Sequence, residues 1–318
     1  MPFILLILGF FLLIKGADSF VGGASSIAKK FNVPSMIIGL TIVAMGTSAP
    51  EAAVSITSAL AGQNDMCVAN VVGSNLFNIL MVLGVSSIIT KLPVEINTIK
   101  KDAPFLVLIS IVLLGFSYDL SISRLEGILF LMFFTYFLIN TIKASRKPNL
   151  VSDSNNSETA IAIEVESSTQ ISMPKTLLVS TIGILGIVFG GDLVVKSATT
   201  IATSLGMSAN LVGLTIVAVG TSLPEFVTSI VAIKKGESEI AIGNVIGSNL
   251  FNMLLVLGLS TSINPIAISP LAFIDIIFMT FITGLLYLFM KKNNSLIKHH
   301  GFIFVILYVS YMSYTIIR

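Results

Sequence analysis

Long apolar runs of about 20 residues alternate with short polar stretches along the whole chain, and each is long enough to cross the ~30 Å hydrocarbon core of a bilayer as a helix. Only 11% of the residues are charged, 54% are hydrophobic and the mean hydropathy is +0.98, which excludes an ordinary soluble domain. The sequence therefore predicts an all-α integral membrane protein with ten membrane-spanning helices. Their expected ranges are 2–28, 33–61, 67–90, 103–119, 124–143, 174–204, 209–233, 240–263, 266–290 and 299–316.

Lysine and arginine residues gather at alternate ends of these predicted helices. Because cytoplasmic loops carry the excess of basic residues, the asymmetry predicts a cell-membrane protein with both termini outside and the central linker in the cytoplasm. The basic residues on the predicted cytoplasmic side are Lys29, Lys30, Lys91, Lys100, Lys101, Lys143, Arg146, Lys147, Lys175, Lys234, Lys235, Lys291, Lys292 and Lys298, against Arg124 and Arg318 outside. The net charge of +2 gives no footprint for a nucleic-acid partner.

An internal repeat runs through the chain at a fixed offset of 174 residues. The segment IGLTIVAMGTSAPEAAVSI at 38–56 matches VGLTIVAVGTSLPEFVTSI at 212–230. Further on, NVVGSNLFNILMVLG at 70–84 matches NVIGSNLFNMLLVLG at 244–258. Matches that share one offset indicate a duplication of the whole helical unit.

Each copy holds five predicted helices, and an odd number of crossings makes the second copy enter the membrane from the opposite side. The fold is therefore predicted as two inverted five-helix repeats, 1–143 (helices 1–5) and 174–318 (helices 6–10), with a polar cytoplasmic linker at 144–173. Inverted repeats with interrupted hydrophobic segments indicate a secondary transporter whose site lies near the bilayer midplane. The interrupting residues are Gly46, Pro50, Gly220 and Pro224.

Two acidic residues, Glu51 and Glu225, occupy matched positions inside apolar segments. A charge at the centre of a spanning helix costs roughly 2.5–3.5 kcal/mol, so both carboxylates are expected to bind something. Their matched positions in inverted repeats allow them to face each other, and a joint charge of −2 suits one divalent cation. Packing alone does not need a carboxylate, so the functional interpretation is favoured for this pair.

Further oxygen donors surround the two acids in the sequence. Carboxylate, hydroxyl, amide and carbonyl oxygens without His or Cys favour Ca²⁺ or Na⁺ over transition metals. Any one of these hydroxyls taken alone is better explained by helix packing, but both repeats carry the whole set. The candidates are Thr47, Ser48, Ser74, Asn78 and the Ala44 carbonyl in the first repeat, and Thr221, Ser222, Ser248, Asn252 and the Ala218 carbonyl in the second.

Other ionisable residues are less informative. Asp18 and Asp192 lie in the first helix of each repeat. They either line an ion path or have a structural role, in ion pairs or helix-end interactions at an interface, and we favour the structural role. His299 and His300 follow a basic loop and are expected to be solvated.

The paired motifs GTSAPE and GSNLFN in one half, and GTSLPE and GSNLFN in the other, resemble the alpha repeats of the calcium/cation antiporter superfamily. Among its branches the chain most resembles the prokaryotic sodium/calcium exchangers. The resemblance implies ten helices, with helices 2, 3, 7 and 8 forming the ion-binding core and helices 1 and 6 sliding across it. It also implies a Ca²⁺ site made by Glu51, Glu225 and the backbone carbonyls of Thr47 and Thr221.

The resemblance further implies overlapping sodium sites. These would use Ala44, Thr47, Ser48, Glu51 and Ser74 on the inner side, and Ala218, Thr221, Ser222, Glu225 and Ser248 on the outer side, with Asn78 and Asn252 bordering the middle. Many relatives, including potassium-dependent exchangers, have Asp where this chain has Asn252. We therefore expect no K⁺ requirement.

The expected function is Na⁺/Ca²⁺ antiport by alternating access, because the two ions compete for one pair of carboxylates. More than two Na⁺ per Ca²⁺ would make the cycle electrogenic. The nearest alternative is Ca²⁺/H⁺ antiport, which does not need the hydroxyl-rich pockets. An enzyme is not expected, since Ser48 and Ser222 have no histidine near them in the sequence, and the duplication argues against a passive channel. We expect no cofactor and no protein partner, Ca²⁺ and Na⁺ being transported substrates, and a chain that functions as a monomer.

Overall fold

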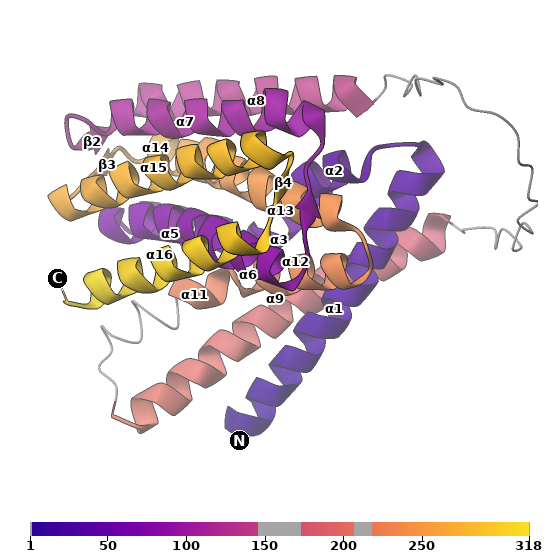
Figure 1. Ribbon diagram of the computed structural model, residues 1–318. Coiled ribbons are helices and arrows are strands. Elements are labelled where there is room, and N and C mark those ends of the chain that lie inside the picture. The colour runs from indigo at the N-terminus through magenta and orange to yellow at the C-terminus, as the bar shows by residue number, and fades with distance from the viewer. Residues whose placement is uncertain (1, 146–172, 207–217, 318) are drawn as a thin grey trace, which may run out of the picture.

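The computed structural model describes residues 2–145, 173–206 and 218–317. Helices account for nearly all of this part of the chain (Figure 1). In the first half they are α1 (Pro2–Phe31), α2 (Ser35–Ile38), η1 (Gly39–Val43), α3 (Ala44–Thr47), α4 (Ala49–Leu60), α5 (Asn64–Phe77), η2 (Asn78–Leu83), α6 (Gly84–Ile89), η3 (Thr98–Asp102), α7 (Ala103–Phe116) and α8 (Arg124–Ser145). In the second half they are α9 (Met173–Ser204), α11 (Ala218–Thr221), α12 (Leu223–Lys234), α13 (Ser238–Phe251), η5 (Asn252–Val256), α14 (Leu257–Ile263), α15 (Pro270–Asn293) and α16 (Lys298–Ile317).

Among the described residues, seven helices are long and apolar enough to cross a membrane, or eight if the bent pair Ser35–Thr47 and Ala49–Leu60 forms one span. This confirms a helical membrane protein. The predicted span at 103–119 corresponds to α7, which has 14 residues and follows the charged turn η3. The predicted span at 209–233 lies partly outside the described residues, as does most of the predicted linker. The count of ten therefore stays a prediction.

Two short antiparallel sheets connect the halves, and neither was predicted from the sequence. The strand β1 (Leu92–Pro93) pairs with β4 (Ser295–Leu296), and β2 (Ser121–Ile122) pairs with β3 (Ile266–Ala267). Strands of two residues are too short to leave an alternating pattern in the sequence. The repeat offset of 174 residues relates β1 to β3 and β2 to β4, so each sheet is the counterpart of the other.

The start of α16 differs from the expectation for its histidines. His299 is exposed as predicted, whereas His300 is buried and its ring stacks on Phe289 with centroids 4.2 Å apart. The backbone N–H of Ile297 donates to Nδ1 of His300 at 3.4 Å. The prediction of a solvated His300 was wrong because β4 turns the chain so that α16 begins against the end of α15.

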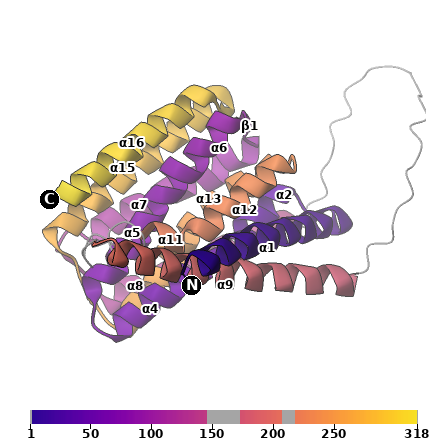
Figure 2. The same cartoon turned by 90° about the horizontal axis from the view of Figure 1, so that it is seen from below.

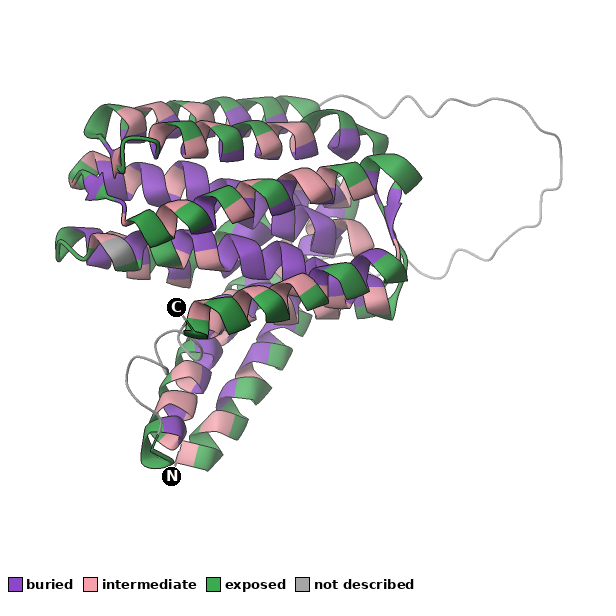
Figure 3. Cartoon of the chain, turned by 60° about the vertical axis from the view of Figure 1, so that its left-hand side comes forward, coloured by how far each residue is buried: buried purple, intermediate pink, exposed green. Residues whose placement is uncertain are grey.

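The two longest helices, α1 and α9, lie side by side and run obliquely to the rest of the bundle (Figures 1 and 2). Glycines let their backbones approach closely, since a Cβ placed on Gly16 would lie 2.7 Å from the carbonyl oxygen of Gly183. Many side chains on the outer faces of this pair and of the bundle are exposed, whereas α5 and α13 lie in the buried centre (Figure 3). The centre of the bundle is therefore formed by the helices that carry the GSNLFN motifs.

A second close backbone approach holds α13 against the broken helix of the first half. A Cβ on Gly243 would lie 2.5 Å from the carbonyl oxygen of Met36 and 3.0 Å from Cα of Gly39. Any side chain at position 243 would therefore push α13 away from α2 and η1.

We expect Gly243→Ala to lower the free energy of unfolding by about 1–3 kcal/mol, because the added methyl group cannot fit without a backbone shift. The measurement is the thermal unfolding midpoint of the purified protein in detergent. Gly284→Ala is the matched control, since a Cβ there meets no described atom within 4 Å. Equal midpoints for the two variants would contradict the close approach.

Candidate functional site

Each repeat contains a helix that breaks one residue before its proline-containing segment. Ser48 separates α3 from α4 with φ −84° and ψ 8°, and the two parts of this span are bent by 50°. Ser222 separates α11 from α12 with φ −92° and ψ 5°. Pro50 and Pro224 stand at the start of the new helices, where a missing N–H does no harm. The glutamate after each proline thus sits in the first turn of a helix, where the macrodipole favours negative charge.

The two glutamates are fully buried and each is held by the opposite repeat. The Ser222 hydroxyl donates to Oε1 of Glu51 at 3.0 Å, and the Ser48 hydroxyl donates to Oε1 of Glu225 at 2.9 Å. These two contacts are repeat mates of each other. The structure therefore brings four predicted residues together, with each serine bonded to the carboxylate of the other half.

A pair of asparagines supports this arrangement, and the sequence analysis did not single them out. Asn244 donates to the backbone carbonyl of Glu225 at 3.4 Å and to the Ser229 hydroxyl at 3.1 Å, and it accepts from Thr47 at 3.0 Å. Its position in the repeated NVIGSN motif was the available signal. The matching contacts of Asn70 are to the Glu51 carbonyl at 3.1 Å, the Ser55 hydroxyl at 2.8 Å and Thr221 at 3.5 Å.

The predicted serines on α5 and α13 lie beside these asparagines. The Ser74 hydroxyl donates to the backbone carbonyl of Asn70 at 2.6 Å, and the Ser248 hydroxyl donates to Oδ1 of Asn244 at 3.5 Å. Both serines are buried. In each case the hydroxyl proton is used, which leaves the oxygen as an acceptor, and the Ser74 oxygen accepts from Nδ2 of Asn252 at 3.3 Å.

The predicted backbone donors are only partly described. The Ala44 carbonyl accepts the backbone N–H of Ser48 at 3.0 Å and lies 3.3 Å from Oγ1 of Thr47. It is therefore engaged within its own helix. Ala218 begins α11, but its side chain and the residues before it lie outside the described part of the chain.

Two further asparagines begin short π-helical turns in the middle of their spans, a distortion that is frequent at functional sites. Asn78 opens η2 and donates through Nδ2 to Oδ1 of Asn249 at 3.1 Å. Asn252 opens η5 and donates to Oδ1 of Asn75 at 3.2 Å and to the Ser74 hydroxyl at 3.3 Å. Both are fully buried, so their amide oxygens stand inside the protein.

Four acceptor atoms of the predicted site residues are buried and have no hydrogen-bond donor within the described part of the chain. They are Oε2 of Glu51, Oε2 of Glu225, Oδ1 of Asn78 and Oδ1 of Asn252. Buried polar atoms are nearly always paired, so four acceptors from two pairs of repeat mates indicate a ligand that supplies positive charge. No group of three or more His, Cys, Asp or Glu side chains able to hold a metal occurs among the described residues.

The oblique helices α1 and α9 cover the two breaks. A Cβ on Gly46 would lie 3.2 Å from the ring of Phe20 in α1, and one on Gly220 would lie 2.3 Å from Cγ2 of Val195 in α9. The glycines of the two GTS motifs are thus needed because a helix passes directly over each break.

The other acids in α1 and α9 are in ion pairs at the surface. Lys235 binds Asp18 at 2.9 Å, and Lys196 binds Asp192 at 2.9 Å. All four side chains are at least one third exposed. This geometry favours the structural interpretation over an ion path.

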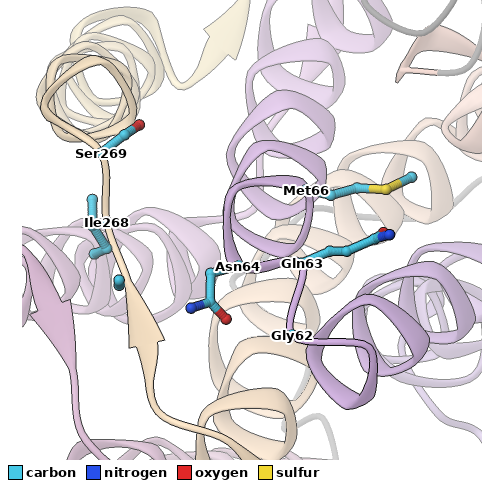
Figure 4. A pocket seen from close by; sticks show the side chains of 7 residues that line it. Gly62, Gln63, Asn64, Met66, Ile268 and Ser269 are labelled. Atoms are coloured by element: carbon cyan, nitrogen blue, oxygen red, sulfur yellow. The ribbon is translucent and has the colours of Figure 1, made fainter.

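An open pocket of about 640 Å³ lies elsewhere, between the α4–α5 turn and the β3–α15 connection (Figure 4). Its lining includes Asn64 and Ser269, and in Figure 4 Asn64 lies between α5 and the strand that leads to Ile268. None of the predicted oxygen donors lines it. The candidate site is therefore separate from this pocket.

A helical membrane protein that buries a matched carboxylate at a helix break in each of two repeats belongs by class to the ion transporters. The family model for the sodium/calcium exchanger protein matches residues 1–143 and 175–317. This chain belongs to the sodium/calcium exchanger family. It is accordingly a membrane antiporter for Ca²⁺ and a second cation rather than an enzyme.

Individual relatives agree with the family assignment. The chain is 44% identical to the putative antiporter CaxA of Alkalimonas amylolytica, over 82% of this chain and 81% of the relative. It is 31% identical to the sodium/calcium exchanger MaX1 of Methanosarcina acetivorans, over 98% and 97% of the two chains. A solved structure of the sodium-calcium exchanger NCX_Mj soaked with 2.5 mM Na⁺ and 0.1 mM Ca²⁺ matches with a TM-score of 0.85, at 29% identity and over 98% of this chain and 97% of that one.

Proposed function

We propose that this chain exchanges Na⁺ for Ca²⁺ across the cell membrane by alternating access. The observation that carries the proposal is the set of four buried acceptor atoms without donors on Glu51, Glu225, Asn78 and Asn252. Two of them are carboxylate oxygens and two are amide oxygens, and a hard cation between the repeats would satisfy all four. The site residues are those named from the sequence.

Calcium fits this donor set by charge and by ligand type. Ca²⁺ takes about 6–8 oxygen ligands and favours carboxylates, carbonyls and amides. The two glutamates balance its charge, and the carbonyls of Thr47 and Thr221 add ligands on either side. We propose these four residues as the Ca²⁺ site, with Asn78 and Asn252 bordering its middle.

Sodium is proposed to use the hydroxyls that flank the same carboxylates. The hydroxyls of Ser48 and Ser222 donate hydrogen bonds to the glutamates, so their oxygen lone pairs can bind a monovalent cation. The sodium sites would then overlap the calcium site, so that the two ions displace each other. The proposed sodium ligands are Ala44, Thr47, Ser48, Glu51 and Ser74 in the first repeat, and Ala218, Thr221, Ser222, Glu225 and Ser248 in the second.

Coupling follows if the empty site cannot cross the membrane with its charge of −2 uncompensated. Sodium moving down its gradient would then drive Ca²⁺ the other way. With more than two Na⁺ per Ca²⁺ the cycle moves net charge and responds to the membrane potential. We propose this electrogenic stoichiometry together with independence from K⁺, since Asn252 provides no carboxylate at the centre of the site.

We also propose the ten-helix inverted topology, with α7 and the segment around α12 as the two additional spans. The reciprocal serine–glutamate bonds and the two matching sheets support a two-fold relation between residues 1–143 and 174–318. The alternation of basic loops supports external termini and a cytoplasmic linker. The proposal needs no second chain, because both repeats of one chain complete the site.

Sodium coupling is tested with purified protein in vesicles loaded with Na⁺ and diluted into Na⁺-free buffer containing Ca²⁺. We expect Ca²⁺ uptake that requires internal Na⁺ and that grows when the vesicle interior is made positive, because net positive charge leaves with sodium. Uptake that ignores Na⁺ and follows an imposed proton gradient would instead identify Ca²⁺/H⁺ antiport.

Neutralising either buried acid should abolish exchange. Glu51→Gln and Glu225→Gln each remove one charge from a buried ionic site, a loss of about 3–5 kcal/mol, so Ca²⁺ flux in the same vesicles should fall by about two to four orders of magnitude. Asp192→Asn is the matched control, since it removes an acid that lies in a surface ion pair. Flux near the wild-type level in either glutamine variant would remove that glutamate from the site.

Potassium independence is tested by replacing K⁺ with choline on both sides of the vesicles. We expect the initial rate of Na⁺-driven Ca²⁺ uptake to stay the same, because the amide of Asn252 offers no charge to a further cation. A rate that rises severalfold with K⁺ concentration would show that potassium binds as a third substrate.

A further inference from the structure

Asn75 and Asn249 are repeat mates that contact each other directly at the centre of the protein. The Nδ2 group of Asn75 donates to the backbone carbonyl of Asn249 at 3.4 Å, and that of Asn249 donates to the backbone carbonyl of Asn75 at 3.2 Å. Both side chains are buried. Because a backbone carbonyl can only accept, these two contacts fix which end of each amide is the NH₂ group.

The orientation of this pair determines the orientation of the next pair. With their NH₂ groups committed, Asn75 and Asn249 present Oδ1 to Asn252 and Asn78, which donate to them at 3.2 Å and 3.1 Å. Because Asn78 and Asn252 direct their NH₂ groups to Asn249 and Asn75, their amide oxygens point to the opposite side. The oxygens of Asn78 and Asn252 are both buried and have no donor among the described residues.

We propose that Asn75 and Asn249 are positioning residues that hold Asn78 and Asn252 with their oxygens toward the transported cation. This inference rests on the proposed function, since it concerns the same site. A reversed amide would present its NH₂ group, the positive end of its dipole, to the cation. The two hydrogen bonds from Asn75 and Asn249 to each other's backbone carbonyls therefore determine the sign of the electrostatic potential at the middle of the site, without any charged residue.

Asn78 and Asn252 are not held by the same number of hydrogen bonds. Asn252 has a second acceptor, the Ser74 hydroxyl at 3.3 Å, whose own proton goes to the Asn70 carbonyl. Asn78 has one acceptor, Oδ1 of Asn249, among the described contacts. Loss of Asn249 therefore frees Asn78, whereas loss of Asn75 leaves Asn252 still held by Ser74.

The experiment measures Ca²⁺ half-saturation of Na⁺-driven uptake by the full chain in vesicles, with the thermal unfolding midpoint of each variant. We expect Asn249→Ala to raise the half-saturating Ca²⁺ concentration by about tenfold or more, the usual effect of losing a residue that orients a ligand. Asn75→Ala should raise it by a smaller factor. Thr283→Val is the control, because that buried hydroxyl donates only to Met279 of its own helix among the described contacts.

A double-mutant cycle separates positioning from general destabilisation. If Asn249 acts through Asn78, then Asn78→Ala together with Asn249→Ala should lie within about twofold of Asn78→Ala alone in Ca²⁺ half-saturation. The inference would be overturned if the double variant showed the product of the two single-variant changes in Ca²⁺ half-saturation, or if Asn249→Ala left half-saturation unchanged. Either result would leave the proposed exchange standing. Wild-type protein without Na⁺-driven Ca²⁺ uptake would overturn the proposed function itself.

Asn249→Ser serves if the alanine variant does not fold, because a serine keeps a small polar group at this buried position but is too short to reach Asn78. It should show the same loss of Ca²⁺ affinity and the same lack of additivity with Asn78→Ala. Wild-type half-saturation in a folded Asn249→Ser protein would overturn the inference.

Discussion

The burial of two carboxylates where the repeats meet is the constraint on which the rest of the structure depends. Glu51 and Glu225 are fully buried, and each accepts a hydrogen bond from a serine of the other repeat, so the two halves of the chain hold each other's glutamate. The broken helices meet the same need, because a break places each glutamate in a first helical turn with a favourable dipole. The glycines before the breaks then let α1 and α9 pass over the site and close it.

Three kinds of hydrogen bond between the two repeats occur in reciprocal pairs. Serine bonds to glutamate twice, threonine to asparagine twice and asparagine to backbone carbonyl twice, each time with both partners shifted by 174 residues. Reciprocal contacts are the mark of a two-fold relation. Asn75 and Asn249 contact their own mates, so the axis passes between them, and all other site residues lie in pairs around it. Two nearly equivalent halves are what an exchanger needs if it is to open to either side with similar energy.

The acids, the hydroxyls and the duplication could be predicted from the sequence. The acids stood out because burying a charge in the membrane is unfavourable, and the hydroxyls and the duplication stood out because their motifs are repeated. The sequence did not reveal the orienting asparagines Asn70, Asn75, Asn244 and Asn249, although they stand in the repeated segments, because duplication copies inert positions as well as functional ones. Their roles depend on which atom faces which partner, and only coordinates contain that information. The two-residue strands and the burial of His300 were missed for a related reason, since both arise from contacts between distant segments.

The repeat mates Ser74 and Ser248 have different hydrogen bonds, which breaks the symmetry between the two repeats. The Ser74 hydroxyl donates to a backbone carbonyl at 2.6 Å and accepts from Asn252, whereas its mate Ser248 donates to the Asn244 side chain at 3.5 Å. The two serines belong to the two proposed sodium sites, whose residue types are the same, so the hydrogen bonds of the serines are what distinguish these proposed sites. Because the Ser74 hydroxyl donates to a backbone carbonyl, its lone pairs keep one direction. The Ser248 hydroxyl donates to the Asn244 side chain and can rotate together with that side chain. The proposed sodium sites of the two repeats should therefore differ in affinity through hydrogen bonding alone, without any change of residue type.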